Sequence, residues 1–223
     1  MRLPFTAQEF LDLLAVYNAA WWPVVVALWI ASLPAAGGVP GRRWTGDRWM
    51  TTLLLVQWTW SAVAYHGALF TRINPAAWLF AALFATEAAL FGWSGVRRTL
   101  SFTSAATRWT RVGRLLIVYA LAYPLINIIE HGSITRVPTF GLPCPTTIFS
   151  AGLLLRASSP PKRLLIVPII WSAIGGSAAF LFGIRADYAL PVAGAALAAF
   201  AWRRPKTSIA SAVSTMHRRE ARS

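Results

Sequence analysis

Seven hydrophobic stretches run along the 223-residue chain, and they constrain its fold more than any other feature. They cover residues 12–36, 49–70, 75–94, 114–130, 145–156, 163–184 and 187–202. Most of them reach the roughly 20 residues that an α-helix needs to cross about 30 Å of hydrocarbon. The sequence therefore predicts an all-α, polytopic membrane helix bundle of about seven transmembrane helices, which occupies residues 1–202.

Positive charge alternates between the segments that join these stretches. Of the 21 Lys and Arg residues, 17 fall in segments 37–48, 95–114, 156–163 and 203–223, and the other four are Arg2, Arg72, Arg136 and Arg185. Positively charged segments are retained on the cytoplasmic side of a membrane. The pattern predicts an N-terminus outside and a C-terminus in the cytoplasm. It also accounts for the net charge of +14 without a nucleic-acid partner, because basic segments bind the anionic lipids of the inner leaflet.

The fifth stretch is shorter than a typical transmembrane helix, so its length alone does not predict a crossing. Residues 145–156 form only about 18 Å of helix at 1.5 Å per residue, so a re-entrant half-helix is the alternative. A re-entrant segment would invert everything after it and leave 12 positive residues outside against 9 inside. The crossing arrangement, with 17 inside and 4 outside, is favoured.

Both ends of the membrane domain have recognisable local sequences. Thr6 and Glu9 have the spacing of a capping box, which predicts that the first helix begins at the outer surface. The tail 203–223 is basic and rich in Ser and Ala, so we expect it to be disordered or to lie on the inner leaflet.

Polar side chains follow the second and fourth stretches at intervals of four residues. Since residues four apart share one face of a helix, each helix is predicted to have a polar seam that leads to its outer end. Two seams that face each other would form a path for a substrate, and hydrogen bonding between helices is the alternative. The seams consist of Gln57, Ser61 and Tyr65, and of Tyr119, Tyr123 and Asn127.

Four potential metal ligands are predicted at similar depth near the outer face. They are His66, Glu130, His131 and Cys144. A thiol, two imidazoles and a carboxylate suit zinc, copper or another transition metal. Two histidines on separate helices could instead bind one haem b, although no Cys-x-x-Cys-His motif for covalent haem is present. The alternative is that these are ordinary interfacial polar groups.

Glu87 is a single carboxylate in the inner half of the third stretch. An acidic residue within a transmembrane helix is costly to bury and marks a candidate proton or cation site. An ion pair with Arg97 or Arg98, or a neutral hydrogen-bonded acid, is the alternative.

Several short motifs resemble those of a known family. They are Leu3-Pro4-Phe5-Thr6 followed by Glu9-Phe10, Tyr65-His66, Ile73-Asn74-Pro75-Ala76, and Pro138-Thr139-Phe140-Gly141-Leu142-Pro143-Cys144-Pro145-Thr146-Thr147. The sequence is similar to an uncharacterised family of bacterial multi-spanning membrane proteins with this PTFGLPCPTT outer-loop motif. The resemblance implies the fold and a place in the bacterial cytoplasmic membrane, and it implies no activity.

The leading functional hypothesis is transport or permeation of a small solute or metal ion. A membrane-embedded metal- or haem-binding redox component is the main rival, and a non-catalytic accessory subunit of a membrane complex is the third class. The two lysines, Lys162 and Lys206, both fall in predicted cytoplasmic segments, so no retinal Schiff base is possible within a span. A phosphate-binding Gly-rich loop, His-Glu-x-x-His and Gly-x-Ser-x-Gly are missing, which favours a role other than catalysis. A homo-oligomer or a membrane partner is compatible with each hypothesis.

Overall fold

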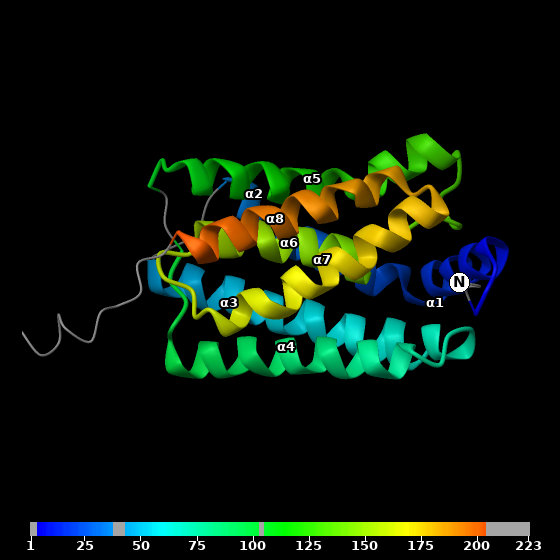
Figure 1. Cartoon of the computed structure of the whole chain (residues 1–223), viewed down its shortest axis with the longest axis horizontal. Helices are drawn as coiled ribbons and strands as arrows, with labels where there is room; N and C mark the ends of the chain where they lie inside the picture. The colour runs from blue at the N-terminus through cyan, green and yellow to red at the C-terminus, as the bar shows by residue number, and fades with distance from the viewer. Residues whose placement is uncertain (1–3, 38–42, 103–104, 204–223) are drawn as a thin grey trace, which may run out of the picture.

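The fold, taken from a computed structural model that describes residues 4–37, 43–102 and 105–203, is a bundle of helices (Figure 1). The described residues form no strand beyond one isolated bridge between Phe102 and Ala157. The all-α prediction is confirmed. The helices are α1 (Ala7–Ser32), the short α2 (Pro34–Gly37), α3 (Arg43–Trp60), α4 (Ala77–Arg97), α5 (Arg108–His131), α6 (Pro143–Arg156), α7 (Arg163–Phe182) and α8 (Ala189–Trp202).

The helix that begins as α3 changes its winding before it ends. It continues as a π-helical segment, Ser61–Gly67, and a 3-10 turn, Phe70–Arg72, follows. A second 3-10 turn, Arg185–Tyr188, joins α7 to α8. π-Helical segments are uncommon and occur frequently at functional sites, because the wider turn changes the direction of the side chains on it.

The segments that connect the helices gather at two ends of the bundle. At one end, which we call the Asp187 end, the ring of Phe5 lies 5.4 Å from Phe70 and 5.6 Å from Phe182, measured between centroids. At the other, the Arg156 end, Arg156 donates a 2.7 Å hydrogen bond to the carbonyl of Ala35. Phe102 forms its bridge with Ala157 at the same end. Consecutive long helices therefore run in alternating directions along the bundle (Figure 1).

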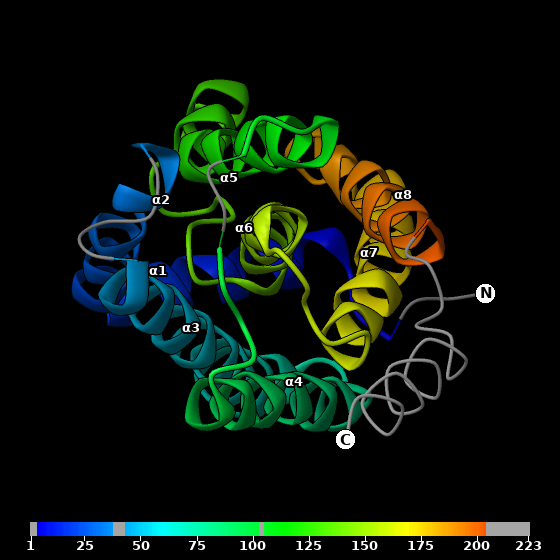
Figure 2. The same ribbon diagram turned by 90° about the vertical axis from the view of Figure 1, so that its left-hand side faces the viewer.

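The short helix α6 lies in the middle of the bundle, and the other helices surround it (Figure 2). Every α6 residue except Cys144 is buried. Its contact with α5 depends on a pair of glycines. A Cβ atom added to Gly113 would lie 2.5 Å from the carbonyl oxygen of Gly152, and one added to Gly152 would lie 2.7 Å from that of Gly113. Because α6 is enclosed by the other helices, it does not need the apolar surface of a lipid-facing helix and can contain polar residues.

Large apolar side chains face outward around the bundle in addition to forming its core, whereas soluble proteins rarely expose large contiguous apolar surfaces. Among them are Leu79, Val96, Leu115, Ile129 and Leu181, each at least 68% exposed. Four helical segments are long and apolar enough to cross a membrane, namely Ala7–Gly37, Ala77–Arg97, Arg108–Glu130 and Arg163–Phe182. The outer surface therefore suits contact with lipid.

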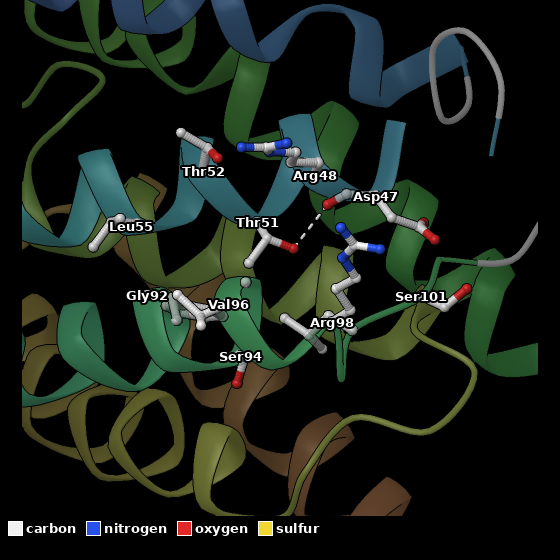
Figure 3. A pocket seen from close by; sticks show the side chains of 13 residues that line it. Asp47, Arg48, Thr51, Thr52, Leu55, Gly92, Ser94, Val96, Arg98 and Ser101 are labelled. Atoms are coloured by element: carbon white, nitrogen blue, oxygen red, sulfur yellow. Dashed lines mark hydrogen bonds between the residues drawn. The ribbon is translucent and has the colours of Figure 1, made fainter. Parts of the chain in front are cut away.

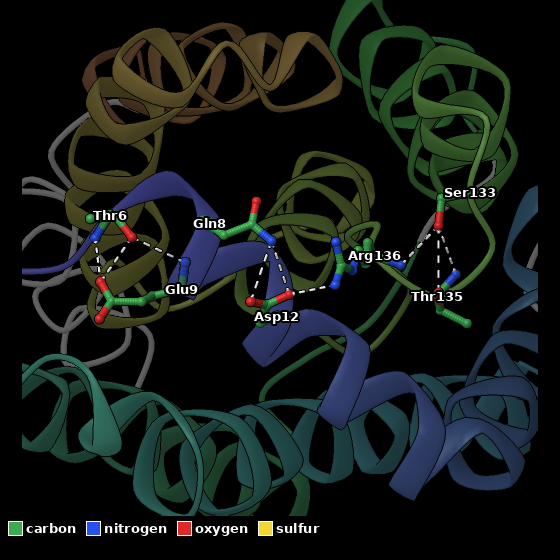
Figure 4. A network of polar contacts seen from close by, with 7 residues as sticks. All are labelled: Thr6, Gln8, Glu9, Asp12, Ser133, Thr135 and Arg136. Carbon is green, nitrogen blue, oxygen red and sulfur yellow. Dashed lines mark hydrogen bonds and ion pairs between the residues drawn. The ribbon is translucent and has the colours of Figure 1, made fainter.

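The first helix begins as the sequence predicts. Thr6 accepts a hydrogen bond from the backbone N–H of Glu9 at 3.2 Å, and Glu9 accepts one from the N–H of Thr6 at 2.7 Å. This capping box is confirmed, and Figure 4 shows it beside an exposed ion pair between Asp12 and Arg136 at 2.9 Å. The predicted tail 203–223 lies outside the described residues, apart from Arg203.

Candidate functional site

A cavity of about 410 Å³ lies at the Asp187 end, between the N-terminal segment and the ends of the long helices. Its aromatic lining includes Phe5, Phe10, Phe70, Phe80, Trp171 and Phe182. Its polar lining consists of Tyr65, Asn74, Tyr123, Cys144, Ser177 and Asp187. Small-molecule sites typically combine mostly apolar walls with a few placed polar groups, so this cavity is the best candidate site in the described part of the chain.

Hydrogen bonds to the preceding loop fix the start of α6 beside this cavity. The side-chain amide of Asn18 donates to the carbonyl oxygens of Thr135 at 2.6 Å and Val137 at 2.9 Å. Ser61 donates to the carbonyl of Gly141 at 2.8 Å, and Gly141 has a φ of 86°, which L side chains rarely adopt. The loop is thus attached to α1 and to the π-helical segment, and it holds Cys144 in the first turn of α6.

Asp187 occupies the polar corner of the cavity. Asp187 is 4% exposed, and its carboxylate accepts hydrogen bonds from the hydroxyl of Tyr123 and the thiol of Cys144. Burial raises the pKa of Asp187 from 3.8 to about 6, and the two hydrogen bonds offset part of that rise. Among the described residues, no Lys, Arg or His forms an ion pair with it. Asp187 is therefore a buried carboxylate near neutral pH, with neutral hydrogen-bond donors around it.

His66, which the sequence places near the outer face, lies fully buried among aromatic rings. Its ring centroid is 4.8 Å from that of Phe84, 5.0 Å from Tyr65 and 5.2 Å from Trp171. Neither ring nitrogen has a hydrogen-bond partner within the described structure. Buried polar groups without partners are rare, and each one calls for a functional or structural explanation.

The described residues do not bring the predicted metal ligands together. Glu130 pairs with Arg185 at 3.3 Å, Cys144 donates to Asp187, and His66 lies in its aromatic surroundings. No group of three or more His, Cys, Asp or Glu that could hold a metal ion is found in the described part of the chain. The side chain of His131 lies outside the described residues, so the metal site and the haem site both stay predictions.

The two predicted seams both reach the cavity, but their other residues contact different partners. Tyr65 from one seam and Tyr123 from the other line the cavity. Gln57 donates to the hydroxyl of Ser32 at 2.8 Å, which directs its seam toward α1. Tyr119 donates to the carbonyl of Ala186 at 2.8 Å. Asn127 donates a hydrogen bond to the carbonyl of Tyr123, and Ser61 donates one to the carbonyl of Gly141. Most seam residues thus bind internal partners, and a continuous substrate path stays a prediction.

Glu87 lies on the buried face of α4, between the cavity and the opposite end of the bundle. Phe84, Glu87, Phe91 and Ser94 are all fully buried on this face, and Phe84 and Phe91 both contact the ring of Trp58. Neither carboxylate oxygen of Glu87 has a hydrogen-bond partner among the described residues, and the hydroxyl of Ser94 also lacks one. The ion pair with Arg97 or Arg98 that the sequence allowed is not formed.

Ser94 is one of the residues that line a second hollow, of about 420 Å³, at the Arg156 end (Figure 3). The side chains of Asp47, Arg48, Thr51 and Arg98 line it together with Ser94. The carboxylate of Asp47 accepts a hydrogen bond from the backbone N–H of Phe102 at 2.8 Å, so it also fixes the chain after α4. The bundle thus has a hollow at each end and unpartnered buried polar groups on the face of α4 between them.

The sequence did not identify Asp187 as a site residue. No spacing rule connects it with Tyr123 or Cys144, which lie on different helices. The available indication is its position, because an aspartate that opens an apolar stretch next to a predicted outer segment is a polar group at the edge of the hydrocarbon.

These features define a class of protein, an all-helical bundle with four helices long and apolar enough to cross a membrane, and with an apolar cavity and a buried carboxylate at one end. The chain belongs to the family of unknown function DUF6064, whose model matches residues 7–211. This confirms the expected membership of an uncharacterised family. No curated protein and no solved structure matches the chain.

Proposed function

We propose that this protein is a seven-span transporter or channel of the bacterial cytoplasmic membrane, which moves a small solute or ion between the cavity at its Asp187 end and the cytoplasm. In this arrangement the Asp187 end faces outward. The outward-facing apolar side chains and the alternating helix directions support the membrane placement. The orientation is supported by the positive residues of the Arg156 end, such as Arg48, Arg97 and Lys162, and by the positive-inside rule.

The remaining three helices can also be crossings, α3 because of its length with the π-helical segment, and α6 and α8 because of their packing. α3 and its π-helical continuation contain 18 and 7 residues, which together are long enough to span the hydrocarbon. α6 is surrounded by protein, so it does not need the apolar surface of a lipid-facing helix. α8 has 14 residues and packs on α7, where Gly194 lies against Ser172.

The observation that carries the proposal is the position of Glu87. A buried carboxylate without a hydrogen-bond partner is expensive to keep in a protein interior, and within a membrane protein it is by default a functional group. Glu87 lies on the α4 face that reaches from Phe80 at the cavity to Ser94 at the second hollow. In the proposed mechanism a solute enters at the cavity, and Glu87 takes up and releases a proton or cation as the solute or ion passes.

Proton flux in liposomes tests this role. Purified protein is reconstituted in liposomes that contain a pH-sensitive dye, and a potassium gradient with valinomycin supplies the driving potential. We expect proton entry above that of protein-free liposomes, and we expect Glu87→Gln to abolish most of it because the amide cannot exchange a proton. Asp12→Asn is the matched control, since Asp12 is an exposed carboxylate in an ion pair with Arg136 and does not line the cavity.

Two results would contradict the proposal. One is a wild-type flux equal to that of empty liposomes under every imposed gradient. The other is full flux in Glu87→Gln, with thermal unfolding used to show that each variant is folded. The first result would favour an accessory subunit, and the second would remove Glu87 from the transport mechanism.

A further inference from the structure

We infer that the cavity at the Asp187 end binds an organic cation with an apolar body, whose charged group lies against the carboxylate of Asp187. This inference rests on the proposed function, because it names the class of solute that the transporter would accept. It is argued from the charge, the lining and the size of the cavity.

The charge of Asp187 has no opposite charge beside it among the described residues. Asp187 is almost completely buried, and the groups that donate to it, Tyr123 and Cys144, are neutral. The nearest basic residue in the sequence, Arg185, pairs instead with Glu130 and is largely exposed. Buried charges in proteins are normally paired with an opposite charge or a metal. A positively charged ligand would supply the partner that the described residues do not.

Aromatic rings line the same cavity as this carboxylate. Phe5 and Phe182 stack with centroids 5.6 Å apart, Phe10 and Phe182 with centroids 5.3 Å apart, and Phe70 meets Phe5 edge to face at 5.4 Å. Aromatic faces attract cations through their quadrupole, and this attraction grows when the cation is removed from water. The same rings also provide apolar surface for the body of the ligand.

Other classes of ligand fit the cavity less well. A bare metal cation such as Ca²⁺ needs six to eight oxygen ligands, whereas the cavity offers one carboxylate among mostly apolar groups. A neutral apolar ligand would fit the rings but would leave the charge of Asp187 unpaired. The volume of about 410 Å³ falls within the range of about 300–1,000 Å³ typical of small-molecule pockets. An amphipathic organic cation satisfies all three conditions.

Calorimetry with a pair of ligands of equal shape tests the inference on the full-length protein in detergent. The cationic probe is benzyltrimethylammonium, whose charge does not depend on pH. The neutral probe is neopentylbenzene, in which a carbon replaces the nitrogen. At pH 8 we expect the cation to bind, Asp187→Asn to weaken it by about 10- to 100-fold, and Asp12→Asn to leave it unchanged. The neutral probe should bind Asp187→Asn at least as tightly as wild type, because the variant has no charge to leave unpaired.

A pH series on the wild-type protein keeps the test independent of any variant that fails to fold. Binding of benzyltrimethylammonium should weaken as the pH falls through about 6, where the carboxylate of Asp187 takes up a proton. Wild-type protein that does not bind the cation, or binding that is equal in Asp187→Asn and insensitive to pH, would overturn the inference.

Uptake of the same cation into liposomes separates this inference from the proposed function. Binding without uptake or proton flux would keep the cation site and remove transport. Proton flux without binding would keep transport and remove the cation site.

Discussion

Tyr123 on α5 donates a hydrogen bond to Asp187, although 64 residues separate the two in the chain. One helical turn earlier, Tyr119 donates to the carbonyl of Ala186 at 2.8 Å. The two phenols therefore hold the turn Arg185–Tyr188 against α5. They also explain how a buried carboxylate is kept at the cavity wall, since hydrogen bonds to the charged form offset part of the cost of burial.

Replacement of Tyr123 by Phe should destabilise the protein more at pH 8 than at pH 4.5. At pH 8 the lost bond is to a carboxylate, and such bonds contribute about 1.5–3 kcal/mol. At pH 4.5 Asp187 is protonated and the loss should fall to about 1 kcal/mol. Thermal unfolding in detergent measures both values. Tyr119→Phe is the control, because its bond to a backbone carbonyl should give a loss that does not change with pH. An equal loss for Tyr123→Phe at both pH values would contradict the charged state of Asp187.

The stability of the wild-type protein should itself fall as the pH rises from about 4 to about 6. Asp187 has a pKa of about 6 in the folded protein against 3.8 for the ordinary group. Between these values the folded state binds more protons than the unfolded state, so raising the pH favours unfolding. The cost, complete above about pH 6, is on the order of 2–3 kcal/mol. Asp187→Asn should remove this component, which a comparison of unfolding temperatures from pH 4.5 to pH 8 would detect. An identical pH profile in the variant would show that other groups cause it.

The helical bundle could be predicted from the sequence because the patterns that specify its helices are local in the chain. Stretches of apolar residues and the Thr6–Glu9 spacing depend only on near neighbours in the chain, and the structure contains the helices and the capping box that they indicate. The central position of α6 in the bundle could not be predicted from such local patterns. Its contact with α5 depends on the close approach of Gly113 and Gly152, two residues whose pairing no local pattern reveals.

The candidate site was predicted only in part, for the same reason. The sequence predicts Cys144 near the outer face and Tyr65 and Tyr123 within the two polar seams, and all three line the cavity. The sequence groups Cys144 with His66, Glu130 and His131, whereas the structure places Cys144 beside Asp187 and pairs Glu130 with Arg185. Similar position along the bundle axis limits which residues can meet, but the rotation of each helix about its axis decides which of them do.

The glycine contact between α5 and α6 should be intolerant of even one added methyl group. In Gly152→Ala the new Cβ would lie 2.7 Å from both the carbonyl of Gly113 and the side chain of Ile117, so the helices must separate. We expect a loss of about 1–3 kcal/mol in the free energy of unfolding. Gly92→Ala on α4 is the matched control, because its Cβ would meet Leu55 at an ordinary 3.6 Å. Unfolding in detergent compares the two. A Gly152→Ala protein as stable as Gly92→Ala would show that α5 and α6 are not in this contact.

Crossing of the membrane by α6 can be tested with two cysteines on either side of it. Cys144 is the single cysteine of the chain, so Cys144→Ser provides a background without thiols. Ile134→Cys lies before α6 and Ser159→Cys after it, and both positions are exposed. If α6 crosses and the Asp187 end faces outward, a membrane-impermeant maleimide should label Ile134→Cys in intact cells and Ser159→Cys only after the cells are opened. Labelling of both in intact cells would mean that α6 returns to the side from which it started. Labelling of Ser159→Cys alone would mean that the orientation is reversed, and the positive residues of the Arg156 end would then need another explanation.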